Sequence, residues 1–227
     1  MPGMPLPLCL VTVIIASVLP LLAQLRFTHS LIPYEVKPEE EQITVSFPFT
    51  ATEDTTVIAY HSPCGCLTHN ITRSDWKKHE QGALQLTLDT TKLKGTARKS
   101  LELQYENLPP QTITIEARLP TLFTCTPKTL QWNGQEPATP KEIILTIHPG
   151  ADFTIQDVTA LRPGFQLQLS APQQSAPDST RTYKLTVTPD ADITEKTMSL
   201  LLVKTTSEIP RYKTTKLLAI KAKQSQL

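Results

Sequence analysis

The residues best suited to chemistry lie in one short loop. Cys64, Gly65 and Cys66, flanked by His61 and His69, place two thiols and two imidazoles within nine residues. The whole chain has only four cysteines and five histidines. Thiolates and imidazoles are the ligands that zinc and copper prefer, and closely spaced thiols also suit redox exchange. If this protein has metal or redox chemistry, we expect it in this loop.

Three states of Cys64 and Cys66 remain open from the sequence. A disulfide across one residue would close a very small ring, and Gly65 supplies backbone freedom for such a turn. Export would favour that oxidised state. Alternatively, both residues are unpaired and simply packed, or one of them pairs with Cys125, because connectivity cannot be deduced from sequence.

The fourth reading is a copper or zinc site formed by His61, Cys64, Cys66 and His69. Structural zinc sites usually draw their ligands from separate turns of the chain. A single nine-residue loop would have to fold sharply to aim all four side chains inward, and Pro63 restricts that folding. We therefore expect no bound cofactor, with copper or zinc as the minority hypothesis.

The first residues indicate export. Residues 6–25 form a nearly uninterrupted apolar stretch, which Pro7 and Pro20 break, and the first charged side chain is Arg26. Such a stretch is typical of a signal peptide, which we place over residues 1–23 because Ala23 offers a small residue at the cut. The protein would then be periplasmic, attached to the cell envelope or secreted. An uncleaved anchor is the alternative, and only then would the protein contact a membrane.

Composition and charge exclude several classes of protein. The chain carries 22 basic and 21 acidic side chains, which is not the charge pattern of a nucleic-acid-binding protein. Twenty prolines against seven glycines suit short strands joined by rigid turns. The remaining chain of about 200 residues is long enough for two domains.

Residues 26–118 read as a first series of strands. Apolar and polar residues alternate over Ile43–Phe49, which is the pattern of a half-buried strand. Similar segments follow at Thr55–Tyr60, Ala83–Leu88, Lys99–Tyr105 and Thr112–Ala117. The only notable helical candidate is one turn around Ser74–Lys78, because Ser74 or Asp75 could cap it.

Residues 120–224 read as a second series. Its strands are expected at Leu122–Cys125, Lys141–Ile147, Phe153–Val158, Phe165–Leu169, Thr182–Val187, Thr197–Val203 and Thr214–Ile220. Strands separated by turns at about ten-residue spacing predict a β-sandwich. The alternation of strands and helices that nucleotide-binding folds need does not occur in the sequence.

Residues 42–118 resemble an exported bacterial family known as a domain of unknown function, number fifteen seventy-three. The resemblance rests on paired apolar residues, the cysteine motif and the turns in order: Phe47 and Phe49, Val57 and Ile58, Cys64-Gly65-Cys66, Gly82, Leu88-Asp89 and Lys94-Gly95. Two turns depart from the family pattern, at Ala51–Asp54 and Gln81-Gly82. The resemblance implies an immunoglobulin-like sandwich without an established activity, and the second half resembles the same sandwich without the cysteines.

We find no catalytic pattern outside the cysteine loop. There is no Gly-x-Ser-x-Gly elbow with a Ser-His-Asp order, and no pair of carboxylates stands out. Trp76 and Trp132 could anchor a ligand such as a glycan, although a core position is the commoner fate of tryptophan.

The sequence therefore predicts two tandem immunoglobulin-like sandwiches and no enzyme. We expect an exported structural or protein-interaction module of the cell envelope, with an unidentified protein or envelope partner. The alternative function is an envelope thiol-redox or copper-binding protein that acts through Cys64 and Cys66.

Overall fold

The computed structural model describes residues 24–106, 108–174, 176, 179–191, 193 and 195–223. The expected signal peptide or anchor over residues 1–23 lies outside these residues. Within the described part there are eighteen strands and one helix of four residues, which confirms the all-β expectation. No helix in that part is long and apolar enough to cross a membrane.

The first sandwich packs a four-stranded sheet on a five-stranded one. The four-stranded sheet has the order β1 (Leu25–Phe27), β3 (Gln42–Ala51), β7 (Gln81–Asp89) and β5 (Leu67–Asn70). The five-stranded sheet has the order β2 (Leu31–Glu35), β9 (Leu108–Arg118), β8 (Thr96–Tyr105), β4 (Thr55–His61) and β6 (Asp75–Trp76).

The alternation along β3 determines which face of the sheet is buried. Ile43, Val45, Phe47 and Phe49 point into the core and are at most 6% exposed, whereas the residues between them face outward. The facing strand β7 contributes its own alternating leucines, Leu84, Leu86 and Leu88. The two strands thus bury one continuous apolar surface against the opposite sheet.

Pro48 lies within β3 although proline has no N–H for the ladder. Its carbonyl accepts a hydrogen bond from Thr28 N at 2.9 Å, just past the end of β1. In an antiparallel pair the N–H and C=O of one residue point to the same neighbour, so the missing donor faces Thr28 and not β7. The proline therefore costs no bond to β7, and β1 ends beside it.

The second sandwich also has two sheets and repeats this arrangement. One sheet has the order β10 (Phe123–Thr126), β12 (Lys141–Ile147), β16 (Arg181–Pro189) and β14 (Phe165–Leu169), with the short β15 (Gln173–Gln174) also paired to β16. The other has the order β11 (Thr129–Trp132), β18 (Thr214–Lys221), β17 (Thr197–Thr205) and β13 (Ile155–Ala160). Each sandwich has its own cluster of buried apolar side chains.

Strand order identifies both units as immunoglobulin-like. Lettered along the chain, one sheet of each sandwich has the order A-B-E-D and the other contains G, F and C, as in immunoglobulin domains. In both, strand A divides: β1 and β10 pair antiparallel with strand B, and β2 and β11 then pair parallel with strand G. The expectation of two tandem immunoglobulin-like sandwiches is confirmed.

The helical turn expected around Ser74–Lys78 is wrong. Asp75 and Trp76 form β6, which pairs with the start of β4. The Trp76 side chain is buried and packs edge-on against Phe49, with ring centroids 4.8 Å apart. This tertiary contact outweighs the local capping signal. The one helix in the described part is instead α1 (Pro210–Lys213), which has proline at its first position.

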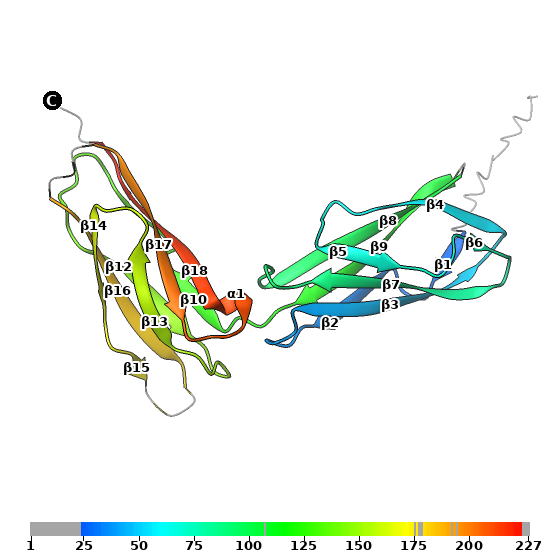
Figure 1. The fold of residues 1–227 in the computed structure, drawn as a ribbon, viewed down its shortest axis with the longest axis horizontal. Helices are drawn as coiled ribbons and strands as arrows, with labels where there is room; N and C mark the ends of the chain where they lie inside the picture. Colours follow the sequence, from blue (N-terminus) through cyan, green and yellow to red (C-terminus); the bar gives the residue numbers. More distant parts are fainter. Residues whose placement is uncertain are drawn as a thin grey trace, which may run out of the picture.

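The two sandwiches lie end to end, with α1 where they meet (Figure 1). Tyr212 of α1 donates a hydrogen bond to Pro120 O in the connection between the sandwiches, at 2.7 Å. Arg211, only 5% exposed, donates to Glu40 O and to Thr90 Oγ1 in the first sandwich. The junction is therefore held by hydrogen bonds from both sides.

Candidate functional site

The cysteine loop connects the two sheets of the first sandwich. It leaves β4 after His61 and enters β5 at Leu67. The loop is closed by a hydrogen bond from Leu67 N to Cys64 O at 3.3 Å, and it is fastened to β7 by one from Asp89 N to Cys66 O at 2.8 Å. These backbone bonds hold the loop in place independently of the side-chain chemistry of its cysteines.

A disulfide joins Cys64 to Cys66. Both residues are half-buried, and Cys66 packs against the core of the first sandwich. A sulfur engaged in a disulfide is not a thiolate, so this pair is not arranged to bind a soft metal. Gly65 has open space around its Cα and does not adopt a left-handed conformation, so its position demands glycine neither for space nor for φ.

The two flanking histidines lie on different sheets. His61 ends β4, where it is paired with Glu102, and His69 lies in β5 with its ring stacked on Tyr60 at a centroid distance of 4.4 Å. Both are exposed. In the part of the chain that the structure describes, no three His, Cys, Asp or Glu side chains are grouped closely enough to hold a metal ion.

Residues 25–119 match the family described as "Protein of unknown function (DUF1573)". The first sandwich is the region that this family model matches, and we name it the DUF1573 domain after that match. This match spans β1 to β9 and includes the cysteine loop, which confirms the resemblance noted from the sequence. No curated protein matches the chain.

The solved structures that match this chain share little sequence with it and have low TM-scores. A protein of unknown function from Porphyromonas gingivalis W83 is 10% identical, with 88% of this chain and 100% of that chain covered, at a TM-score of 0.35. The secreted serine protease VesC from Vibrio cholerae is 8% identical, with 89% and 52% covered, at a TM-score of 0.34. Extracellular cadherin domains 1–4 of protocadherin gamma B7 are 12% identical, with 89% and 51% covered, at a TM-score of 0.34.

The third candidate cysteine lies outside the DUF1573 domain. Cys125 is in β10, where it is paired with Leu145, and it is free and buried in the core of the second sandwich. Burial raises the pKa of its thiol to about 11, against a smaller opposing effect of Lys94 and Lys128. The thiol is therefore neutral near pH 7 and poorly suited to nucleophilic attack.

Both tryptophans belong to the cores. Trp76 of the DUF1573 domain is 5% exposed, and Trp132 of the second sandwich is fully buried. Trp132 Nε1 donates to Thr139 O at 2.7 Å, so its polar edge is already bonded. Neither side chain is available as an exposed anchor for a ligand.

One surface that the sequence reasoning missed is an apolar face on the second sandwich. Leu161, Met198 and Leu200 are 58%, 47% and 39% exposed. On β18, Leu218 lies opposite Leu200 and Ile220 lies opposite Met198 on the same outer side of the sheet. We call these five residues the apolar face.

The sequence did contain a signal for the apolar face. Within β17 the inward positions are Ser199, Leu201 and Val203. The residues between them are also apolar, whereas a strand with one solvated face usually alternates with polar residues. A strand that is apolar on both sides without a covering layer indicates a second contact surface.

Proposed function

We propose that this protein is an exported, non-enzymatic interaction module of the cell envelope, which binds a protein partner through the apolar face of its second sandwich. The observation that carries the proposal is this face, a row of apolar side chains on the outer side of the sheet, of which three are exposed and two half-buried. The immunoglobulin-like fold and the DUF1573 domain support the class of function and leave the partner to be identified.

The composition of the apolar face favours burial against another protein. Side chains that lie opposite each other on neighbouring strands touch, so Leu200 with Leu218 and Met198 with Ile220 form one continuous patch. Contiguous exposed apolar patches on soluble proteins commonly mark contact sites, since each Å² buried contributes about 25 cal/mol.

Charges at one end of the face indicate the partner's chemistry. Lys204 near the end of β17 and Lys216 near the start of β18 lie at one end of the face, on the same outer side of the sheet, and both are exposed. Asp157 lies opposite Lys204 and partly offsets its charge. We therefore assign the face to a partner surface with an apolar centre and carboxylates along one side.

Site-specific photocrosslinking in cells that make the protein tests this proposal. A photoreactive residue at position 200 should form an adduct with a partner protein, whereas the same residue at position 144 should not. Ile144 is the matched control because it is 37% exposed, similar to Leu200, but lies on the opposite sheet.

A second substitution tests whether the adduct from position 200 depends on the apolar face. Leu218→Glu should abolish the adduct formed from position 200, because a carboxylate would then lie in the centre of the face. Equal adducts from positions 200 and 144, no adduct from either, or an adduct only with a second copy of this chain would contradict the proposal.

No specific observation favours the alternative of thiol-redox or copper chemistry at Cys64 and Cys66. The pair forms a disulfide fastened to β7, and His61 and His69 are separated onto two sheets. We therefore propose no second function.

A further inference from the structure

A pocket of about 400 Å³ lies at the junction of the two sandwiches. The turn before β8 contributes one wall through Lys94 and Gly95, and the region around β10 contributes another through Phe123 and Lys128. The α1 helix closes a third side with Tyr212. Both sandwiches therefore contribute residues to the lining, so the complete pocket forms only where the two domains meet.

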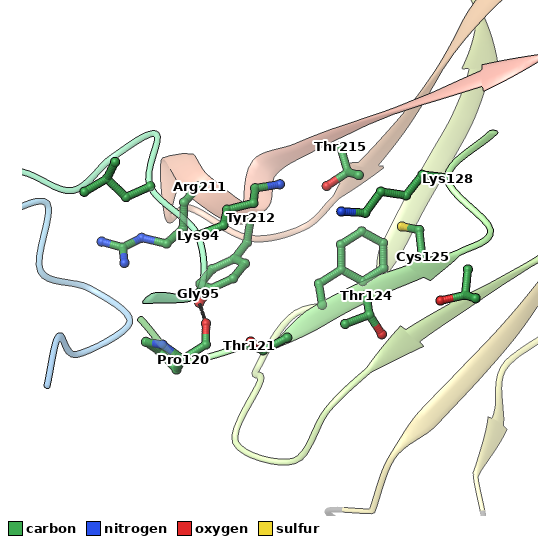
Figure 2. Close-up of a pocket in the computed structure, with 13 residues that line it drawn as sticks. Lys94, Gly95, Pro120, Thr121, Thr124, Cys125, Lys128, Arg211, Tyr212 and Thr215 are labelled. Carbon is green, nitrogen blue, oxygen red and sulfur yellow. Dashed lines mark hydrogen bonds between the residues drawn. The ribbon is translucent and has the colours of Figure 1, made fainter. Parts of the chain in front are cut away.

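The pocket is lined by cations and by no carboxylate. Lys94 of the first sandwich and Lys128 of the second extend toward one another from opposite sides, with Thr215 between them in the view of Figure 2. Neither lysine forms an ion pair within the described part of the chain, although other surface lysines do, such as Lys141 with Glu136 at 2.7 Å. Two like charges facing the same space are unfavourable without a counter-ion.

Cys125 also lies in the lining of this pocket. Both Lys94 and Lys128 act on the pKa of the Cys125 thiol in the lowering direction. Charges shift a pKa mainly at short range, and both lysines belong to the same pocket lining as Cys125. The two lysines therefore share one region of the pocket.

Arg211 of α1 also contributes to the pocket wall. Its side chain is buried, and its Nε and Nη1 have no hydrogen-bond partner in the described part of the chain. Its Nη2 donates only to uncharged groups, Glu40 O and Thr90 Oγ1. In Figure 2 the guanidinium points away from the two lysines and toward the first sandwich, so it adds positive charge to the junction but does not line the space between Lys94 and Lys128.

The rest of the lining determines the kind of anion that fits. The aromatic rings of Phe123 and Tyr212 form an apolar part of the wall, and the threonine hydroxyls of Thr121 and Thr215 can donate to an oxygen. A ligand with an oxyanion and a small apolar body matches this combination, because such sites are mostly apolar with a few convergent polar groups.

We infer that the junction pocket binds a small oxyanion, the carboxylate or phosphate group of an organic ligand, between Lys94 and Lys128. The ligand would join one cation from each sandwich, so binding would link the two domains and restrict their relative motion. The site is independent of the apolar face, which lies on the outer surface of β17 and β18.

Calorimetric titration tests the inference with two probes, inorganic phosphate and benzoate, at constant ionic strength set with chloride. Binding of both probes indicates an oxyanion site, and tighter binding of benzoate indicates that the aromatic wall contributes. Lys94→Gln and Lys128→Gln should each weaken binding roughly tenfold, because each removes one charge-assisted hydrogen bond.

Control substitutions of lysines outside the pocket distinguish specific binding in the pocket from general attraction of an anion to a positively charged surface. Lys92→Gln and Lys196→Gln remove one exposed charge from each sandwich outside the pocket lining and should leave binding unchanged. Amide chemical-shift changes on adding benzoate should concentrate at Gly95, Thr121 and Thr215. The inference is overturned if neither probe binds the wild-type protein at millimolar concentration, or if the control substitutions weaken binding as much as those in the pocket.

Discussion

Arg211 Nη2 donates a hydrogen bond to Thr90 Oγ1 over 2.8 Å, which joins α1 of the second sandwich to the residue that follows β7 in the first. Thr90 is fully buried, and its hydroxyl also donates to Glu40 O at 2.5 Å. The Thr90 hydroxyl thus connects two segments of the DUF1573 domain with the second sandwich. Because Asp89 N binds Cys66 O, the cysteine loop is attached to the same end of β7.

Thr90→Val should destabilise the protein. Valine keeps the shape of threonine but leaves the buried Arg211 with one fewer acceptor, and an unpaired buried donor costs about 1–3 kcal/mol. Thr87→Val is the control, since the Thr87 hydroxyl bonds to Thr44 Oγ1 in an exposed pair. Urea unfolding should show a loss for Thr90→Val that is clearly larger than for Thr87→Val. Equal losses would mean that the junction bond adds no stability.

Gly82→Ala should be costly. A Cβ at Gly82 would lie 2.4 Å from Trp76 Cη2 and 2.7 Å from Phe49 Cζ, so both rings would have to move. Overpacking of a core typically costs about 1–3 kcal/mol. Gly65→Ala in the cysteine loop should be close to neutral, because nothing lies within 4 Å of its Cβ. Thermal unfolding of both variants checks this contrast, which would be contradicted by a larger loss for Gly65→Ala.

Glu116 should make the stability of the first sandwich depend on pH. Hydrogen bonds from Arg118 and then from Arg98 lower the pKa of Glu116 below its ordinary value of 4.5. A carboxyl whose pKa is lower in the folded state stabilises it fully above the unfolded pKa. That contribution is lost as the pH falls through the folded pKa.

The measurement is urea unfolding of wild type and Glu116→Gln at a series of pH values. The variant should be less stable at pH 7, and the difference should shrink as the pH falls below about 4.5. Glu142→Gln, which removes an exposed pair with Lys184, should show little difference throughout. A gap between wild type and Glu116→Gln that stays constant from pH 7 to pH 2 would contradict this account.

Removal of the Cys64–Cys66 disulfide should have a small effect on folding. The stabilisation expected from closing a loop falls with its length, and for a ring with one intervening residue it is about 1–2 kcal/mol. The backbone bonds at Cys64 O and Cys66 O remain in a Cys64→Ser/Cys66→Ser variant. Its free energy of unfolding should lie within about 2 kcal/mol of the oxidised wild type. A loss above about 4 kcal/mol would show that the disulfide is required for the fold.

Strands with strong alternation were predictable. Ile43–Phe49 and Lys141–Ile147 fall within observed strands because one face of each must be buried, and that requirement leaves a period of two in the sequence. The short edge strand β2, Leu31–Glu35, was missed. It contains Pro33 and no buried residue, and it forms only by pairing parallel with β9.

Local sequence patterns predicted the wrong structure at Ser74–Lys78 and gave no indication of the pocket lysines. Ser74 and Asp75 suggested a helix cap. Instead, the Trp76 ring packs against Gly82, which has no side chain, and the segment pairs with β4 as strand β6. Lys94 and Lys128 carry no motif, so nothing in the sequence indicated that they line one pocket.

By itself, the sequence determined the all-β class, the division into two sandwiches and the resemblance of the first to the DUF1573 family, because burial periodicity and the ordered Cys-Gly-Cys and turn residues are local properties. Only the tertiary structure decided the pairing of Cys64 with Cys66, the isolation of Cys125 in the second core, and the junction where Arg211 meets Thr90. The place of Cys125 and the Arg211–Thr90 bond depend on which strands pair and on how the two sandwiches meet, and such long-range contacts leave no pattern of spacing along the chain. The Cys64–Cys66 pairing is local, but the competing partner Cys125 is excluded only by its place in the second core.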